Sequence, residues 1–228
     1  NGDRVVAHLP QGAKFNAKET VDARKQALAP GFINMLSWAP ESLIVDGRGQ
    51  SDLRQGVTLE VFGEGWSMGP MTDAMKKEAL AQQQDFSFDI NWTTLGEYLE
   101  SMEKRGISMN VASLVGATTV RIHELGYENR APTAGELESM QALVRNAMSE
   151  GALGVGASLI YAPGFYASAE EIEALSLAAA ESGGGYMAHM RSEANRFNES
   201  LDALIAVSRK TRQHAEVYHL KAAGRDNW

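Results

Sequence analysis

The stretch "GALGVGASLIYAPGFYASAEEIEALSLAAAESGGGYMAHM", Gly151 to Met190, contains one complete repeat of the sequence pattern that predicts the fold. It begins with an apolar run, continues with Ser168 and Glu171 at capping-box spacing before an amphipathic helix, and ends in a second apolar run, 184–190. Nearly continuous apolar strands that alternate with helices are typical of a parallel sheet covered by helices. The stretch therefore predicts a β-α-β unit.

The same alternation extends along the chain in both directions. Helices are predicted after a second capping box, Thr133 with Glu136, and over 198–211. The strands that complete the set are predicted at 31–37, 57–65, 107–116 and 215–222. About six such units predict an α/β fold, either a (β/α)₈ barrel or a doubly wound sheet. No G-x-G-x-x-G follows the first strand, and polar residues gather at the carboxyl ends of the strands, where barrels carry their chemistry. A closed barrel needs two strands more than are found.

Bulk properties exclude several classes of protein. The formal net charge is −8, so the chain has no basic field to attract nucleic acid or anionic lipid. No segment is apolar for long enough to span a membrane. The absence of cysteine removes disulfides and thiolate ligands. The chain lacks an initiator Met, so we expect part of a longer protein; the cytoplasm is the expected compartment, with the periplasm or secretion left open.

Two histidines and a glutamate could form a metal site. His189 and His219 each come late in an apolar strand, one strand-helix repeat apart, so both should reach the same rim of the sheet. With a carboxylate from Glu64 they make a plausible His₂-carboxylate zinc set. A lone histidine is more often structural, and Glu64, between two glycines, can equally be a solvated loop residue. From the residues alone, both interpretations stay open.

Further polar residues surround these histidines. Lys221 lies two residues beyond His219, on the same face of a strand, and with Tyr161 it could hold a substrate carboxylate. Ser158 lies at the same predicted strand end as Tyr161. A solvated lysine and a core tyrosine are the alternatives. In "HMRSE", Arg191 and Glu193 could pair with each other or orient the neighbouring imidazole.

Several motifs resemble a known family. "GDRVVAHL" and "VDARKQALAPGFI" are similar to the opening of amidohydrolase-superfamily proteins. The motifs "QGVTLEVFGEG", "NVASLVG", "EGALGVGASLIYAPGFYAS", "YMAHMRSE" and "YHLKAAGRDNW" resemble, in order, the N-acyl-D-amino-acid deacylases, or D-aminoacylases. The resemblance covers nearly the whole chain.

The resemblance implies a fold, a reaction and a set of site residues. It implies a (β/α)₈ metal-hydrolase barrel over 31–228, preceded by part of a small β-sandwich over 1–30. The implied reaction is zinc-dependent hydrolysis of a small N-acyl-D-amino acid to a carboxylate and a D-amino acid. Zinc ligands fall on Glu64, His189 and His219, and substrate contacts on Tyr161 and Lys221, with Ser158 beside them. The family's general base, an aspartate, is expected beyond Trp228, so residues 1–228 alone are expected to be inactive.

Departures from the family pattern shape the metal prediction. The first strand of such barrels normally ends in His-x-His, but Leu36 and Trp38 occupy those positions here. The usual strand-2 cysteine is absent, and the fourth strand has no lysine that could bridge two metals. We therefore expect one zinc ion beside an apolar wall. The alternatives are a barrel that has lost catalysis and binds a ligand or partner, or an amidohydrolase acting on another linear or cyclic amide; oligomeric state is left open.

Overall fold

The computed structural model describes residues 4–10, 12–83 and 87–228. The chain divides into two units, Asn1–Pro30 and Gly31–Trp228. Within the first unit the described residues form turns and irregular backbone without a strand. The β-sandwich strands predicted for 1–30 are therefore not confirmed.

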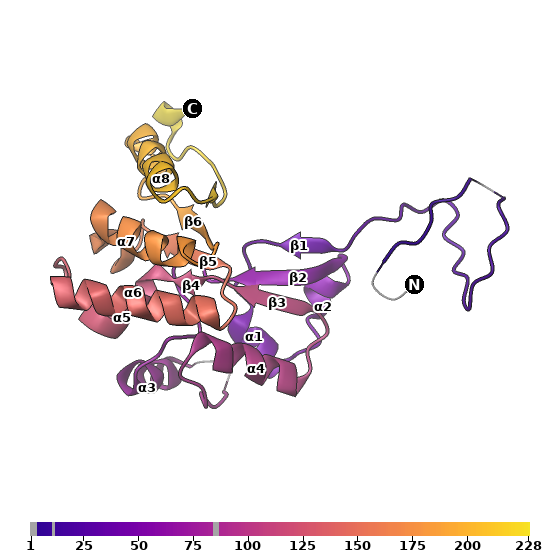
Figure 1. Cartoon of the computed structure of the whole chain (residues 1–228), viewed down its shortest axis with the longest axis horizontal. Helices are drawn as coiled ribbons and strands as arrows, with labels where there is room; N and C mark the ends of the chain where they lie inside the picture. Colours follow the sequence, from indigo (N-terminus) through magenta and orange to yellow (C-terminus); the bar gives the residue numbers. More distant parts are fainter. Residues whose placement is uncertain (1–3, 11, 84–86) are drawn as a thin grey trace. The chain divides into compact units, whose positions relative to one another are not determined.

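The second unit is an α/β fold built on parallel strands (Figure 1). One sheet has the order β1-β2-β3 and the other β4-β5-β6-β7, and every pair is parallel. The strands are β1 (Phe32–Asn34), β2 (Val57–Phe62), β3 (Asn110–Ser113), β4 (Val115–Gly116), β5 (Gly154–Ser158), β6 (Gly185–His189) and β7 (Ala215–Val217). Only Leu114 separates β3 from β4, and its N–H donates to the carbonyl of Phe62 at 2.9 Å. The segment 110–116 therefore joins the two sheets, and the predicted strand order along the chain is confirmed.

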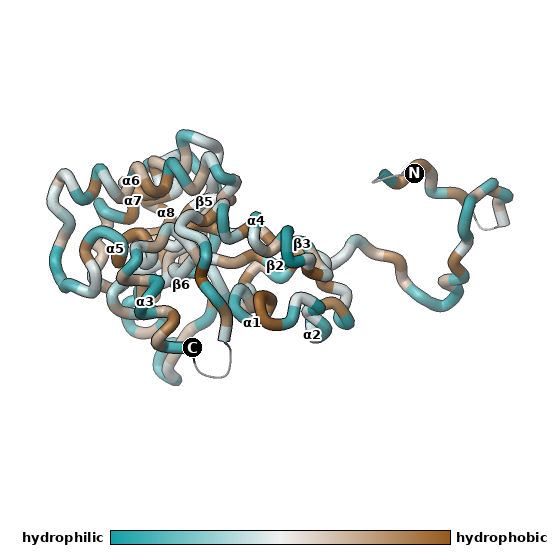
Figure 2. Tube along the Cα trace, turned by 90° about the horizontal axis from the view of Figure 1, so that it is seen from below, coloured by the Kyte–Doolittle hydropathy of each residue, from teal (hydrophilic) through white to brown (hydrophobic). Residues whose placement is uncertain are grey.

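Helices follow the strands and cover them from outside (Figure 1). They are α1 (Pro40–Val45), α2 (Gln50–Leu53), α3 (Asp73–Gln82), α4 (Leu95–Arg105), α5 (Ala117–Leu125), α6 (Ala134–Ser149), α7 (Ala169–Ala180) and α8 (Phe197–Thr211), with 3₁₀ turns at Gly164–Tyr166 and Arg225–Asn227. The apolar residues concentrate in the strands and on the inner helix faces, as the hydropathy colours show (Figure 2). Of the helices that the structure describes, none combines the length and apolar character needed to cross a membrane.

Capping explains where several helices begin. The predicted box of Thr133 and Glu136 forms in full at the start of α6. The box predicted for Ser168 and Glu171 forms only in half: Ser168 accepts from the Glu171 N–H at 3.2 Å, but the Glu171 carboxylate binds Arg121 instead. An ion pair with a buried guanidinium outweighs a bond to one backbone N–H, so the reciprocal half of that prediction was wrong.

The Arg121–Glu171 pair joins α5 to α7 inside the protein. Both side chains are about 1% exposed, and Arg121 Nη1 lies 2.5 Å from Glu171 Oε2. Arg121 Nη2 also donates to the carbonyls of Glu128 and Arg130, at 3.1 and 2.5 Å. Burial raises the pKa of Glu171, and the guanidinium opposes that rise. One cation thus fixes two helices and the loop between α5 and α6.

Replacing Arg121 by Met should destabilise the protein strongly. The substitution leaves a buried carboxylate without its cation, which costs about 3–5 kcal/mol. Arg145→Met is the matched control, because its pair with Glu181 is 44% and 53% exposed; such a pair contributes about 0–1 kcal/mol. Urea unfolding would measure both changes, and equal losses for the two variants would show that the buried pair has no special role.

Candidate metal centre

Three predicted site residues converge at the carboxyl edge of the strands. Glu64 follows β2, His189 is the last residue of β6, and His219 lies just beyond β7. Parallel strands present their carboxyl ends on one side, so residues far apart in sequence meet there. Glu64 and His189 are buried, and His219 is partly exposed. The alternative of a solvated Glu64 carboxylate is thereby excluded.

Two glycines place Glu64 inside the protein. Gly63 and Gly65 have φ values of 102° and 76°, in the left-handed region that favours glycine. A Cβ on Gly65 would lie 2.6 Å from Ser158 Cβ, and one on Gly63 would lie 2.3 Å from the Leu114 carbonyl oxygen. The chain after β2 therefore passes directly against β4 and β5. This close approach needs the "GEG" sequence and directs the Glu64 side chain toward the histidines.

The spacing of the three ligand atoms suits a tetrahedral metal ion. Glu64 Oε1 lies 3.2 Å from His189 Nδ1 and 3.3 Å from His219 Nε2, and the three potential ligand atoms all lie within 4.8 Å of one another. The imidazole rings meet edge to face, with centroids 4.4 Å apart. Zinc bonds of about 2.0–2.1 Å in a tetrahedron separate neighbouring ligand atoms by about 3.3 Å. These residues could therefore hold zinc with little rearrangement.

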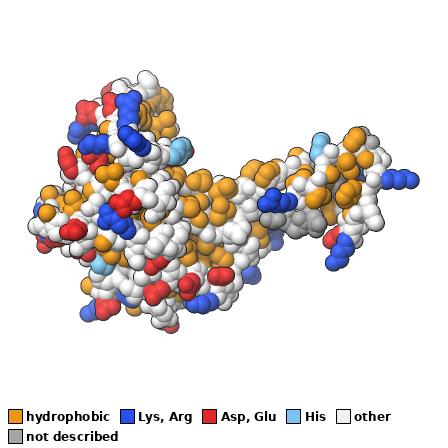
Figure 3. Space-filling view, viewed as in Figure 1, with side chains coloured by type: hydrophobic (Ala, Val, Ile, Leu, Met, Phe, Trp, Pro, Cys, Tyr) orange, Lys and Arg blue, Asp and Glu red, His pale blue; other side chains and the backbone are white. Residues whose placement is uncertain are grey.

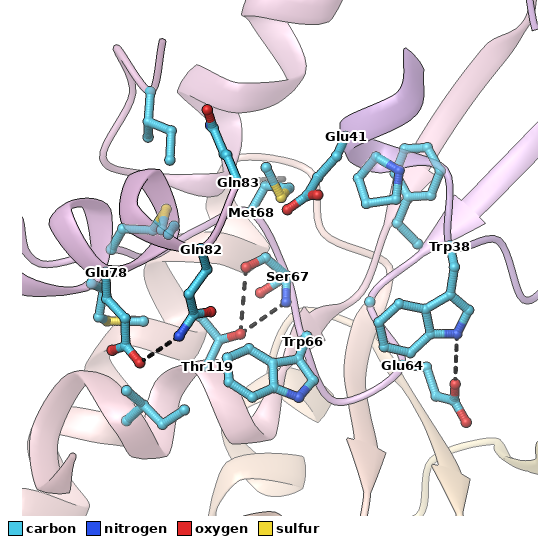
Figure 4. Close-up of a pocket in the computed structure, with 18 of the residues that line it drawn as sticks. Trp38, Glu41, Glu64, Trp66, Ser67, Met68, Glu78, Gln82, Gln83 and Thr119 are labelled. Atoms are coloured by element: carbon cyan, nitrogen blue, oxygen red, sulfur yellow. Dashed lines mark hydrogen bonds between the residues drawn. The ribbon is translucent and has the colours of Figure 1, made fainter. Parts of the chain in front are cut away.

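Trp38 contacts the other oxygen of Glu64. Its indole Nε1 donates to Glu64 Oε2 at 3.0 Å (Figure 4). The neighbouring Ser37 fixes this segment, because its N–H donates to the carbonyl of Val61 and its hydroxyl to the Glu60 carboxylate. The predicted wall beside the metal site is thus not purely apolar, since it supplies a hydrogen-bond donor. The sequence could have suggested this, because an indole N–H at the end of the first strand can only donate.

Glu193 lies on the opposite side of the imidazoles from Glu64. Its Oε1 is 3.2 Å from His189 Nε2 and 3.3 Å from His219 Nδ1, the nitrogens that do not face Glu64. The His189 contact lacks hydrogen-bond geometry, so Nε2 is a buried nitrogen without a bonded partner among the described residues. Of the two open roles for Glu193, its position beside both imidazoles fits the orienting role better than a pair with Arg191, although the structure shows proximity and no hydrogen bond to either ring. A carboxylate in this place orients metal-binding histidines in many sites.

The electrostatics favour neutral imidazole beside a charged carboxylate. Burial lowers the pKa of His189, although the charge of Glu193 opposes this, so the ring is neutral near pH 7. Burial also disfavours the ionised form of Glu193, but Lys221 and the two histidines outweigh it and hold the pKa below its usual range. Neutral imidazole is the form that binds a metal.

The predicted substrate contacts lie around the same centre. Tyr161 is 60% exposed and turns its ring toward the edge of His189, with centroids 5.4 Å apart. Ser158 is buried and pairs in register with His189. Lys221 Nζ lies 2.5 Å from Glu193 Oε1 and 2.9 Å from His219 Nδ1, so its ammonium is already partnered. Tyr161 is not a core residue and Lys221 is not freely solvated, but their contact with substrate stays a prediction.

Arg191 contacts the turn after β5. Its guanidinium donates to the carbonyls of Phe165 and Ala167, at 2.5 and 2.7 Å. The Arg191–Glu193 pair, one of the two alternatives left open by the sequence, does not form, because this turn offers two carbonyl acceptors and Lys221 supplies the cation for Glu193.

Comparison with known proteins by sequence identifies relatives of this chain. No family model matches it. D-aminoacylase from Alcaligenes xylosoxydans xylosoxydans is 28% identical over 228 residues, which is all of this chain and 47% of the relative. N-acyl-D-aspartate deacylase of the same organism is 29% identical over 99% of this chain and 45% of its own length. The chain resembles the D-aminoacylases. It spans about half the length of these curated relatives.

Solved structures extend the D-aminoacylase likeness to the fold. The crystal structure of D-aminoacylase superposes with a TM-score of 0.78 at 29% identity, over 87% of this chain and 42% of that one. N-acyl-D-glutamate deacylase from Bordetella bronchiseptica, in complex with zinc and a phosphonate inhibitor, superposes with a TM-score of 0.75 at 28% identity, over the same shares. Another D-aminoacylase structure is described as having a binuclear metal centre. The resemblance inferred from sequence motifs is thus confirmed.

Gly65→Ala should test the close approach that places Glu64. A side chain at this positive φ, pressed against Ser158, should cost about 1–3 kcal/mol of stability. Gly135→Ala is the control, since a Cβ there meets no atom within 4 Å and the residue lies in α6; it should be neutral or stabilise by up to about 1 kcal/mol. Thermal or urea unfolding would compare them, and a Gly65→Ala variant as stable as the parent would contradict the interpretation.

Proposed function

We propose that this protein hydrolyses the amide bond of N-acyl-D-amino acids, with one zinc ion held by Glu64, His189 and His219. The observation that carries the proposal is the convergence of three potential ligand atoms within 4.8 Å of one another at the carboxyl edge of the sheet, with Glu64 Oε1 at 3.2 and 3.3 Å from the two imidazole nitrogens. The similarity to D-aminoacylases over the whole chain supports it independently. The reaction consumes one water molecule and yields a carboxylate and a free D-amino acid.

Each residue of the proposed site has a separate role. Zinc, when bound, supplies a Lewis acid for the acyl carbonyl and lowers the pKa of a water molecule to about 7. Glu193 orients both imidazoles from their outer nitrogens. Lys221 and Tyr161, with Ser158 beside them, are proposed to hold the α-carboxylate, which requires the Lys221 ammonium to be shared between Glu193 and the substrate.

One zinc ion rather than two is favoured by the surroundings of Glu64. Leu36 and Trp38 offer no metal ligand where a His-x-His pair would stand. The Trp38 indole also donates to Glu64 Oε2, so the oxygen that could bridge to a second ion already has a partner. An indole N–H cannot accept or ligate, and it therefore competes with a second cation at this position.

We also propose that the strands of the second unit belong to a closed (β/α)₈ barrel in the whole protein. The strands pair in parallel in the order of the sequence, as successive barrel strands do. Phe32 and Ile33 of the edge strand β1 are 61% and 54% exposed, and hydrophobic side chains gather over β1 (Figure 3). A further strand would cover them. Residues 1–30 would then contribute to the small β-sandwich that accompanies such barrels in the resembled family.

Zinc content and stereoselective turnover together test the proposed function. The whole protein should contain about one zinc per chain and should cleave N-acetyl-D-amino acids in preference to their L-enantiomers. Glu64→Ala, His189→Ala and His219→Ala should lose both properties, because each removes a ligand. His214→Ala is the control, since that histidine is exposed and pairs with Glu216. A metal-free protein without amidase activity on either enantiomer would instead support a ligand-binding barrel.

Trp38→Phe should weaken the metal site while keeping an aromatic ring in place. Loss of an outer hydrogen-bond partner of a metal ligand typically costs about 10–100-fold in metal affinity. Competition with a chelator would measure the zinc affinity. Trp66→Phe is the matched control, because Trp66 lies in the same region but does not donate to Glu64 (Figure 4). Equal zinc affinity in Trp38→Phe and Trp66→Phe would contradict a positioning role for Trp38.

A further inference from the structure

A cavity of about 570 Å³ begins directly beside the metal centre. Glu64 and Trp38 belong to both the cavity and the centre: Glu64 Oε1 faces the histidines, and Oε2 faces the Trp38 indole. Figure 4 shows Trp38, Trp66 and Glu64 toward one end and Glu78 and Gln82 toward the other. Neither histidine lines the cavity, so Glu64 and Trp38 are the link through which a group bound at the histidines could extend into it.

Much of the cavity wall is apolar and adaptable. Three methionines lie along it, on α3 and on the segment that precedes it. The main apolar lining residues are Phe62, Met68, Met71, Met75, Ile90 and Ile122. Methionine is unbranched and flexible, so a wall of this kind conforms to a flexible alkyl chain more readily than a wall of branched side chains. Ligand pockets of several hundred Å³ with such linings bind apolar groups.

The charges around the centre are divided between two sides. Among the described residues that line the cavity there is no Lys, Arg or His, whereas three glutamates, Glu41, Glu64 and Glu78, are present. The ammonium of Lys221 lies outside this lining, beside His219 and Glu193. A substrate carboxylate should therefore be repelled from the cavity and attracted to the Lys221 side. This division of charge favours a substrate that binds with its acyl group toward the cavity.

The glutamates do not make the cavity a good site for a cation. Glu78 Oε1 accepts from the Tyr127 hydroxyl at 2.9 Å and from Gln82 Nε2 at 3.0 Å. Glu64 Oε2 accepts from Trp38. Two of the three carboxylates are thus already partnered, and the stretch between them is bordered by methionine and isoleucine.

We propose that this cavity is the acyl subsite and that it takes an unbranched apolar acyl chain longer than acetyl. The proposal rests on the proposed function, because it assumes that an amide carbonyl is held at Glu64, His189 and His219. It adds the class of acyl group, which the reaction alone does not define. The same geometry places the α-carboxylate on the side of Lys221.

A chain-length series on the whole zinc-loaded protein tests the subsite. For N-acyl-D-alanines from acetyl to octanoyl, kcat/KM should rise about 3- to 4-fold per added methylene, the factor expected when a methylene leaves water. Ala79, which lines the cavity from α3, is the residue to enlarge. Ala79→Phe should lower octanoyl turnover about 10-fold or more relative to acetyl turnover, since the new ring displaces two or more methylenes. Ala81→Phe, at an exposed position on the same helix, should keep the parental profile.

The outcomes separate this proposal from the proposed function. A flat chain-length profile in the parent, or equal losses at all lengths in Ala79→Phe, would overturn the acyl subsite. So would a preference for N-acetyl-D-arginine that Ala79→Phe abolishes, because the cavity would then hold the amino-acid side chain.

If no N-acyl-D-amino acid is hydrolysed, the proposed function fails, and calorimetry then tests whether the cavity binds an alkyl chain. Octanoate should then bind more tightly than acetate to the parent and to Ala81→Phe. In Ala79→Phe this difference in affinity should disappear. Equal binding of the two anions to the parent would overturn the acyl subsite.

Discussion

The candidate centre depends on one buried carboxylate, that of Glu64. An ionised carboxylate inside a protein is stable only when its oxygens have partners, because removal from water is costly. Here one oxygen faces two imidazoles and the other accepts the Trp38 indole N–H. The carboxylate comes from β2, the imidazoles from the ends of β6 and β7, and the indole from the segment after β1. Four strand ends are therefore held in fixed relation by one functional group.

The backbone around Glu64 explains how it reaches that position. The segment after β2 crosses close to β4 and β5, and glycines on both sides of the contact leave room for it. Gly65 meets Ser158, and Gly116 and Gly156 would each place a Cβ within 2.3 Å of a carbonyl oxygen of Gly65 or Gly63. A chain with side chains at these points could not bring the two backbones together. The small residues that look featureless in the sequence thus decide where the Glu64 carboxylate lies.

Much of the architecture follows from local sequence patterns, whereas contacts between side chains far apart in the sequence could not be predicted from them. Apolar runs and capping residues predicted the strands and the start of α6, because both depend on neighbours in the chain. The pairing of Glu171 with Arg121 could not be read locally, since it joins residues 50 positions apart and overrides the capping box. Similarly, the predicted grouping of Glu64, His189 and His219 followed from strand ends, whereas the bond from Trp38 and the contacts of Glu193 depend on side-chain directions. The resemblance to D-aminoacylases supplied what the residues alone left undecided.

The position of Glu193 has a mechanical consequence. A single oxygen of this side chain lies within 3.3 Å of both imidazoles and contacts the Lys221 ammonium. A shift of the loop after β6 relative to the loop after β7 would break several of these contacts together, so the contacts link the two loops to each other. Under the proposed function, adjustment to acyl chains of different size would fall to the opposite border, where α3 and the methionines of the cavity wall lie outside the cluster of Glu64 and the histidines. In that case the metal centre and the acyl subsite would occupy separate parts of one rim, the first constrained by Glu193 and the second bordered by flexible side chains.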